Sequence, residues 1–249
     1  MSNRLKYHMN RRTFIKSAGA AAGMATLPLF SIGKPGGSPN GRLNLAFIGA
    51  GNIAKMAFDQ TKSENWVALC DVDSHYLDEA KATYPEAAGA RTFRDFRAML
   101  DEMGDDIDGV CVSTPDHTHY VATMWAMEHG KHVCTQKPLT RTIWEARTLR
   151  KAAAETGVVT NMANQGHTYD GIRQLREWLD YGLIGDVGKV HSWERGPAWG
   201  NSYFAKPAQF PPPSAPVPAN LDWDLWLGPL EDHVYNPIYH PKTWRSIWD

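Results

Sequence analysis

A glycine-rich turn directly after an apolar segment constrains the fold of this chain more than any other feature. Residues 43–48 are apolar apart from one asparagine, which predicts a strand buried on both faces of a parallel sheet. Gly49, Gly51 and Ala54 follow in G-x-G-x-x-A spacing. The first glycine permits a tight turn, the second leaves space for a diphosphate against the backbone, and the alanine lets a helix pack close to the strand.

An acidic residue stands where a dinucleotide-binding fold needs one. The next apolar segment, residues 66–70, ends at Asp71, about twenty residues beyond the glycines. A carboxylate there accepts hydrogen bonds from ribose hydroxyls and repels a 2′-phosphate, so the pattern predicts NAD rather than NADP. Asp73 is the nearby alternative. A helix beginning near Asn52 would offer its free N–H groups to the phosphates. The residues predicted to hold the diphosphate are Gly49, Gly51, Asn52 and Ile53.

The rest of residues 42–165 repeats the alternation of strand and helix. The pattern predicts strands near Thr92 and over 108–113, 132–135 and 158–162, with helices over 93–100, 119–129 and 142–155. This alternation predicts a doubly wound parallel sheet, which binds ligands at the carboxyl ends of its strands. The polar residues expected at that edge are Thr114, Pro115, His117 and His119, then Gln136 and Lys137, then Gln165 and His167.

The first residues of the chain are typical of a targeting signal. Asn-Arg-Arg-Thr-Phe-Ile-Lys at residues 10–16 matches the twin-arginine motif, and a mild apolar run follows over 17–30. That run is too short and too weakly apolar to span a membrane comfortably. We therefore assign residues 1–32 to a twin-arginine signal and 33–41 to a linker rich in Gly, Pro and Ser. No clear A-x-A cleavage site follows, so cleavage stays open.

The export route has a consequence for how tightly the cofactor must be bound. The twin-arginine machinery carries proteins that are already folded, so it is an expected partner and a cofactor can be loaded before export. Outside the cytoplasm little free dinucleotide is present for exchange. We therefore expect NAD to be tightly bound and recycled within each catalytic cycle in a periplasmic or otherwise exported protein.

Composition excludes some functions. The chain has 26 basic and 27 acidic residues, so no overall positive charge attracts nucleic acid. The three cysteines form no CxxC pair and are interpreted as core thiols. His117 and His119 alternate like ligands at a strand end, but the sequence offers no third ligand. We therefore expect no metal site.

The glycine fingerprint, Cys70-Asp71-Val72-Asp73, and the segments 113–119 and 130–139 together resemble the Gfo/Idh/MocA oxidoreductase family. The resemblance implies a nicotinamide cofactor and a sugar-like substrate. It also implies that Thr114, Pro115, His119, Gln136 and Lys137 contact the cofactor. His117, Gln165, His167 and Trp199 are candidate substrate contacts.

Lys137 is the catalytic candidate that the resemblance gives. The family's Glu-Lys-Pro motif places a lysine beside the nicotinamide and the substrate hydroxyl. An ammonium there can stabilise developing alkoxide charge and relay the proton. Gln136 stands where the family usually has Glu, so hydrogen bonding is retained and a negative charge is lost.

The resemblance also implies a second domain with an open, mostly antiparallel sheet. We assign residues 166–249 to its beginning, with the first strand continuing through 191–195, and we expect the domain to be incomplete. The family's aspartate and histidine of that domain have no assignable match. When complete, the sheet would support a homo-oligomer. Trp199, Trp223 and Trp226 could stack on a sugar face or anchor a Pro-rich loop.

Three functions remain compatible with the sequence. The leading interpretation is an NAD-dependent oxidoreductase that acts on a secondary hydroxyl of a sugar, cyclitol or glycoside. A redox-neutral glycoside hydrolase or lyase would oxidise the sugar transiently and then return the hydride. A dinucleotide-binding protein without catalysis, or an inactive fragment, is the third alternative.

Overall fold

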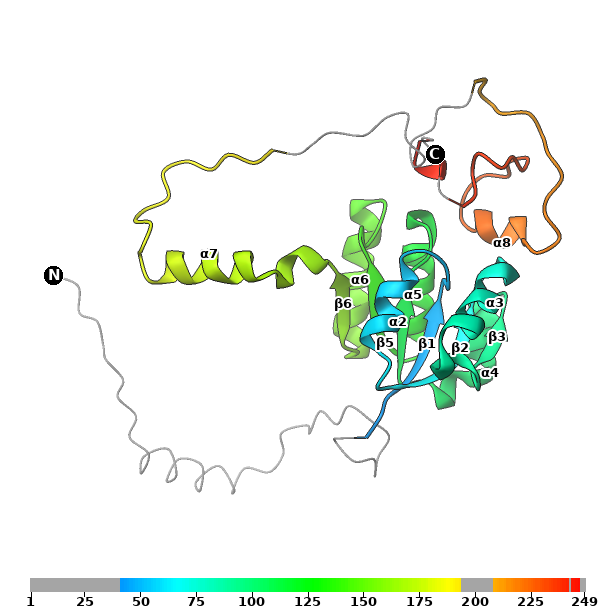
Figure 1. Cartoon of the computed structure of the whole chain (residues 1–249), viewed down its shortest axis with the longest axis horizontal. Helices are drawn as coiled ribbons and strands as arrows, with labels where there is room; N and C mark the ends of the chain where they lie inside the picture. Colours follow the sequence, from blue (N-terminus) through cyan, green and yellow to red (C-terminus); the bar gives the residue numbers. More distant parts are fainter. Residues whose placement is uncertain (1–40, 194–207, 242, 247–249) are drawn as a thin grey trace. The chain divides into compact units, whose positions relative to one another are not determined.

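A computed structural model describes residues 41–193, 208–241 and 243–246 (Figure 1). Contacts separate residues 1–41 from a folded unit of residues 42–249. None of the helices in the described ranges combines the length and the apolar character needed to cross a bilayer.

The centre of the folded unit is a six-stranded parallel sheet in the order β3-β2-β1-β4-β5-β6. The order reverses between β1 and β4, which is where open sheets of this kind bind ligands. The strands are β1 (Asn44–Ile48), β2 (Asn65–Cys70), β3 (Arg91–Phe93), β4 (Gly109–Val112), β5 (His132–Gln136) and β6 (Thr160–Ala163). The doubly wound parallel sheet predicted from the sequence is thus confirmed.

Helices connect the strands and cover the sheet (Figure 1). The α-helices are α2 (Ala54–Gln60), α3 (Ser74–Thr83), α4 (Phe96–Met103), α5 (His119–Glu128), α6 (Ile143–Thr156), α7 (Asp170–Asp180) and α8 (Trp223–Leu227). Short 3-10 turns are η2 (Pro85–Ala87), η3 (Gly104–Asp106), η4 (Asp116–Thr118), η5 (Gln165–Thr168) and η6 (Thr243–Ser246). Local chemistry sets the ends of α6: Thr142 and Glu145 form a capping box, and Gly157 ends the helix with φ 70°.

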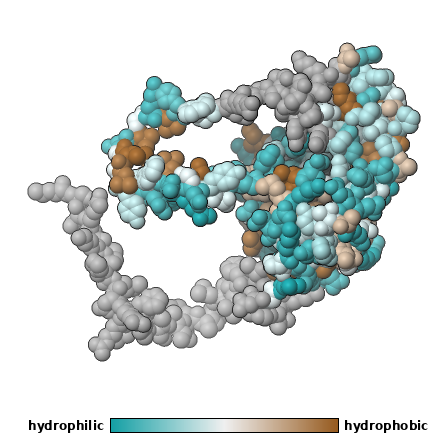
Figure 2. All heavy atoms as spheres, viewed as in Figure 1, coloured by the Kyte–Doolittle hydropathy of each residue, from teal (hydrophilic) through white to brown (hydrophobic). Residues whose placement is uncertain are grey.

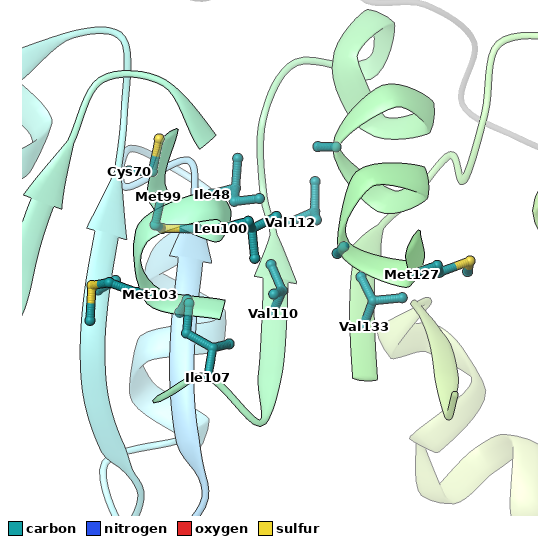
Figure 3. Packing of buried hydrophobic residues seen from close by; sticks show 14 of the residues in the cluster. Ile48, Cys70, Met99, Leu100, Met103, Ile107, Val110, Val112, Met127 and Val133 are labelled. Atoms are coloured by element: carbon teal, nitrogen blue, oxygen red, sulfur yellow. The ribbon is translucent and has the colours of Figure 1, made fainter. Parts of the chain in front are cut away.

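The alternation of β1 divides the core into two layers. Ala46 and Ile48 face a cluster built with α4, α5 and α6, part of which is drawn in Figure 3. Leu45 and Phe47 face a cluster built with α2 and α3. In that second layer the Phe47 and Phe58 rings pack edge to face with centroids 4.9 Å apart. Both faces of β1 are therefore buried, which explains its nearly continuous apolar sequence.

Some boundaries differ from those the sequence predicts. Helix α2 begins at Ala54 rather than near Asn52, because Asn52 has φ 44°, outside the helical range. Helix α4 begins at Phe96 rather than at 93, because Asp95 caps it with its side chain. Both differences lengthen the loops at the carboxyl edge of the sheet.

The start of the predicted second sheet is not found in the described residues. Residues 182–193 contain no strand, although the sequence predicts one continuing from residue 191, and residues 194–195 lie outside the described ranges. A strand is stable only with neighbours to pair with, and no described segment provides one. Apolar side chains of α7 and the turns after it are also exposed, among them Ile172, Leu175 and Leu179 (Figure 2).

A third, smaller core surrounds α8. Its buried members are Leu221, Trp226, Leu227, Tyr235 and Tyr239. The segment joins the carboxyl edge of the sheet through an isolated antiparallel bridge between Asp73 and Leu221. We call residues 220–241 and 243–245 the clasp.

Candidate functional site

A cavity of about 880 Å³ opens at the carboxyl ends of the strands, beside the turn between β1 and α2. It is the place that the reversal of strand order predicts. All ten residues predicted to contact the cofactor line this cavity. They are Gly49, Gly51, Asn52, Ile53, Asp71, Thr114, Pro115, His119, Gln136 and Lys137.

Gly49 lets three strands meet at the floor of the cavity. Its φ is +91°, and a Cβ there would lie 2.7 Å from the carbonyl carbon and oxygen of Ser113, after β4. Its N–H donates to the Cys70 carbonyl at the end of β2, at 2.8 Å. No side chain fits between these backbones, so this position requires glycine.

The turn after Gly49 presents free backbone donors. The N–H groups of Gly51, Asn52 and Ile53 have no acceptor among the described residues, whereas the next N–H, of Ala54, donates to the Gly51 carbonyl at 2.9 Å. Three adjacent unpaired donors beside a cavity form an anion site. The hydroxyl of Thr114 is also buried without a partner in the described part of the chain, and it lines the same cavity. These donors fit the diphosphate of a dinucleotide.

Tyr76, on α3, is a wall of the cavity that sequence reasoning missed. A Cβ on Gly51 would lie 2.8 Å from its ring, so the second glycine accommodates an aromatic side chain as well as any ligand. The Tyr76 hydroxyl lies 3.5 Å from the Asn52 amide nitrogen. The sequence could have indicated Tyr76 only through its position, five residues after Asp71.

Asp71 ties the end of β2 to the glycine turn. One carboxylate oxygen accepts from the Ala50 N–H at 2.7 Å, and the other accepts from the Asp73 N–H at 2.9 Å. Burial raises the pKa of Asp71 to about 6, although the two backbone hydrogen bonds act in the opposite direction. Each oxygen keeps a further lone pair, so both can still accept from ribose hydroxyls.

Lys137 follows β5 and lines the cavity with an exposed side chain. The preceding Gln136 is buried, and its side-chain oxygen accepts from the Lys137 N–H at 3.3 Å. The peptide bond between Lys137 and Pro138 is cis. Lys137 therefore stands at the opening of the cavity, on a loop fixed by its neighbour.

His119 joins the loops after β4 and β5. Its Nδ1 lies 2.6 Å from the Pro138 carbonyl and its Nε2 lies 2.8 Å from the Thr114 carbonyl. His119 borders the cavity, and its polar atoms are used to position the loop that carries Lys137.

The candidate substrate contacts are not brought together. His117 is buried, and its Nε2 donates to the Trp226 carbonyl at 2.7 Å. Burial lowers the pKa of His117 to about 4, so the ring is neutral near pH 7. Gln165 and His167 do not line the cavity that holds the predicted cofactor contacts, and Trp199 lies outside the described residues.

Side chains after β2 and after β4 hold the clasp, in addition to backbone hydrogen bonds from the Ser74 N–H to the Asn220 carbonyl and from the Asp222 N–H to the Val72 carbonyl, both at 2.9 Å. Asp73, after β2, accepts from the Asn220 amide at 2.6 Å and contacts His240 Nε2 at 3.0 Å. His117, after β4, holds the Trp226 carbonyl, and the two rings lie 4.9 Å apart. Further residues of the clasp line the cavity, including Pro241, Trp244 and Arg245. The clasp thus forms one wall of the candidate cofactor site.

Apart from Trp226, nothing in the sequence indicated that the clasp would line the candidate cofactor site. Asp73 was considered as a ribose ligand, but it caps α3 through the His75 N–H and anchors the clasp. Burial opposes the charged form of Asp73, yet hydrogen bonds from His240 and Asn220 lower its pKa overall. Within the described ranges, no three His, Cys, Asp or Glu side chains gather as metal ligands.

Residues 43–164 match the family described as "Oxidoreductase family, NAD-binding Rossmann fold", abbreviated GFO_IDH_MocA. The chain carries an oxidoreductase domain of the Gfo/Idh/MocA family. Residues 8–28 match the signal sequence of the twin-arginine translocation pathway, so this family domain carries an address for export to the periplasm or beyond.

The relatives of this Gfo/Idh/MocA domain include two named dehydrogenases. Inositol 2-dehydrogenase of Rhodococcus jostii is 29% identical over 161 residues, which cover 63% of this chain and 41% of the relative. D-glucoside 3-dehydrogenase of Escherichia coli is 31% identical over 146 residues, which cover 58% of this chain and 41% of the relative. The chain thus spans about two fifths of the length of these relatives.

A solved structure shows the same fold. Scyllo-inositol dehydrogenase from Lactobacillus casei, with bound NAD(H) and scyllo-inositol, matches with a TM-score of 0.53 and 24% identity. The match covers 58% of this chain and 43% of that protein.

Proposed function

We propose that this protein is an NAD-dependent oxidoreductase that moves a hydride between the nicotinamide and a secondary hydroxyl of a sugar, cyclitol or glycoside. The observation that carries the proposal is one cavity that joins unpaired backbone donors, an acidic residue and an exposed lysine. The names of the relatives, an inositol and a glucoside dehydrogenase, support the substrate class.

Different residues would bind different parts of the cofactor. The N–H groups of Gly51, Asn52 and Ile53 would bind the diphosphate, and Asp71 would accept from the adenosine ribose. The placement of Asp71 favours NAD, because a 2′-phosphate would meet its carboxylate. The nicotinamide would then extend toward Lys137, and bound NAD would supply the hydride acceptor there.

Lys137 would act as the general base and general acid for the reacting hydroxyl. During oxidation its Nζ, as the neutral amine, receives the proton that leaves the oxygen and becomes the ammonium, while the carbon gives up its hydride. During reduction the same nitrogen returns the proton. Gln136 fixes the backbone of Lys137 through an uncharged oxygen, so it orients the lysine without adding negative charge.

We further propose that the cofactor is held tightly. A wall anchored on both sides of the cavity, at Asp73 and His117, would have to loosen before a dinucleotide could leave. Such retention suits a protein with an export signal, because free dinucleotide is scarce outside the cytoplasm.

The test is replacement of Lys137 in the full-length protein. Lys137→Ala should bind NAD with unchanged affinity and lose turnover by about 100-fold or more, the range for a positioned acid or base. Lys151→Ala is the matched control, because that lysine is exposed on α6 and does not line the candidate cofactor cavity. Turnover of Lys137→Ala at the wild-type rate would refute the assignment.

The clasp also favours a second candidate, a redox-neutral glycoside hydrolase or lyase. Such an enzyme oxidises the sugar, eliminates the aglycone and returns the same hydride, so a retained cofactor is an advantage. Release of the aglycone without net accumulation of NADH would select this function over a dehydrogenase.

A further inference from the structure

A second cavity of about 680 Å³ shares a wall with the first. Four residues line both: Asp116, Trp226, Trp244 and Arg245. Lys137 lines the first cavity, and the next residue, Pro138, lines the second. A molecule reacting beside Lys137 could therefore extend past Trp226 into the second cavity.

One side of this cavity is aromatic. Trp223, Trp226, Tyr239 and Trp244 line it from the clasp. The Trp223 and Trp226 rings are stacked with centroids 4.7 Å apart and an interplanar angle of 12°. The backbone of Trp226 is also fixed by the hydrogen bond from His117. The aromatic surface is thus rigid before any ligand arrives, which lowers the entropic cost of binding.

The opposite side is polar. Asp116 follows β4, and Thr140 and Arg141 follow β5, so all three come from the Rossmann loops beside the candidate cofactor site. Aromatic faces opposite a few charged and hydroxyl groups suit a ring with one apolar face and a polar rim.

Trp226 adds an independent sign of a ligand. Its side chain is 5% exposed, and its indole N–H has no acceptor among the described residues. Leaving a buried donor unpaired is costly, and in native proteins such donors usually have a partner. A hydroxyl or ether oxygen of a ligand in either cavity would provide one.

We propose that the second cavity binds the aglycone ring of a glycoside whose sugar reacts beside Lys137. The inference rests on the proposed function and narrows it. The substrate is a glycoside with a second ring, sugar or aromatic, rather than a free monosaccharide or cyclitol. The aromatic clasp recognises the apolar face of that ring, and Arg141 and Asp116 contact its polar edge.

The test measures binding to the NAD-loaded full-length protein by calorimetry. The probes are matched methyl and phenyl glycosides of D-glucose, D-galactose and D-xylose, with cellobiose as the probe for a second sugar ring. We expect the phenyl or cellobiosyl member to bind about tenfold more tightly than its methyl partner, from added stacking and apolar burial. Equal affinities of all pairs, or no binding by any probe, would overturn the inference.

Variants locate the effect. Trp223 lines the second cavity and not the first, so Trp223→Ala should remove the preference for the second ring and leave methyl glycoside binding unchanged. Trp223→Phe should restore part of the preference. Trp144→Ala is the control, since that tryptophan is 66% exposed on α6 and lines neither cavity. A preference that survives Trp223→Ala would exclude this cavity as its source.

Turnover separates the two proposals. Equal kcat/KM for methyl and phenyl glycosides, with NADH formed from both, would support the oxidoreductase and refute the aglycone site. Tighter binding of phenyl glycosides that is lost in Trp223→Ala, with no hydride transfer from any probe, would support the site and refute the proposed function.

Discussion

Replacing His240 tests whether the clasp retains the cofactor. The His240 Nε2 lies 3.0 Å from a carboxylate oxygen of Asp73, with side chains 13% and 7% exposed. His240→Ala removes this contact but leaves Asp73 with the Asn220 amide and the His75 N–H as donors. No buried charge is orphaned, so the loss is one hydrogen bond to a charged acceptor, about 2 kcal/mol.

That energy sets the expected change in release. About 2 kcal/mol shifts the equilibrium between docked and released clasp about 30-fold toward release. If the clasp must open before NAD leaves, the dissociation rate constant of NAD rises by up to about 30-fold. Stopped-flow chase of bound NADH with excess NAD, followed by NADH fluorescence, measures it directly.

Two further variants decide the cause. His240→Gln keeps an N–H donor near Asp73 and should restore most of the slow release, whereas exposed His167→Ala should behave like wild type. A dissociation rate of His240→Ala within twofold of wild type, with an unchanged circular dichroism spectrum, would refute the role of the clasp. If NAD dissociates from His240→Gln as fast as from His240→Ala, then packing of the His240 ring, and not its hydrogen bond, holds the clasp.

The remaining predictions concern the glycine turn and its acid. Burial raises the pKa of Asp71 to about 6, so the charged form that accepts hydrogen bonds from ribose hydroxyls is lost as pH falls. The Kd of NAD, measured by calorimetry, should therefore rise about tenfold from pH 7 to pH 5. In Asp71→Asn the Kd of NAD should not change with pH over this range. A pH dependence as steep as that of the wild type would contradict this reasoning. Because the folded pKa of Asp71 exceeds its unfolded value, the free energy of unfolding of the cofactor-free protein should also fall as pH rises through 4–6. Gly49→Ala should lower the free energy of unfolding by about 3 kcal/mol or more in urea, because its Cβ would meet the Ser113 backbone, whereas Gly89→Ala, in open space, should be nearly neutral.

Local sequence signals were sufficient for the sheet and the floor of the site. The apolar run before Gly49 and the alternation of strands and helices determine where the carboxyl ends of the strands meet. Once that edge is known, residues that follow strands, such as Thr114 and Lys137, must lie near one another. Their convergence on one cavity follows from topology, which a periodic pattern encodes well.

The far wall of the site could not be predicted in this way, because it depends on contacts across long stretches of chain. His240 is 167 residues from Asp73, and no periodicity links the two. Asp73 has the same spacing whether it binds a ribose, caps a helix or holds a distant histidine, and only the folded backbone selects the last two. His117 gives the same lesson: beside His119 it suggested a metal or a substrate, yet burial leaves it neutral and its Nε2 holds the Trp226 carbonyl. Asp73 and His117 thus join the clasp to the Rossmann domain, and the proposed site for a second ring depends on that junction.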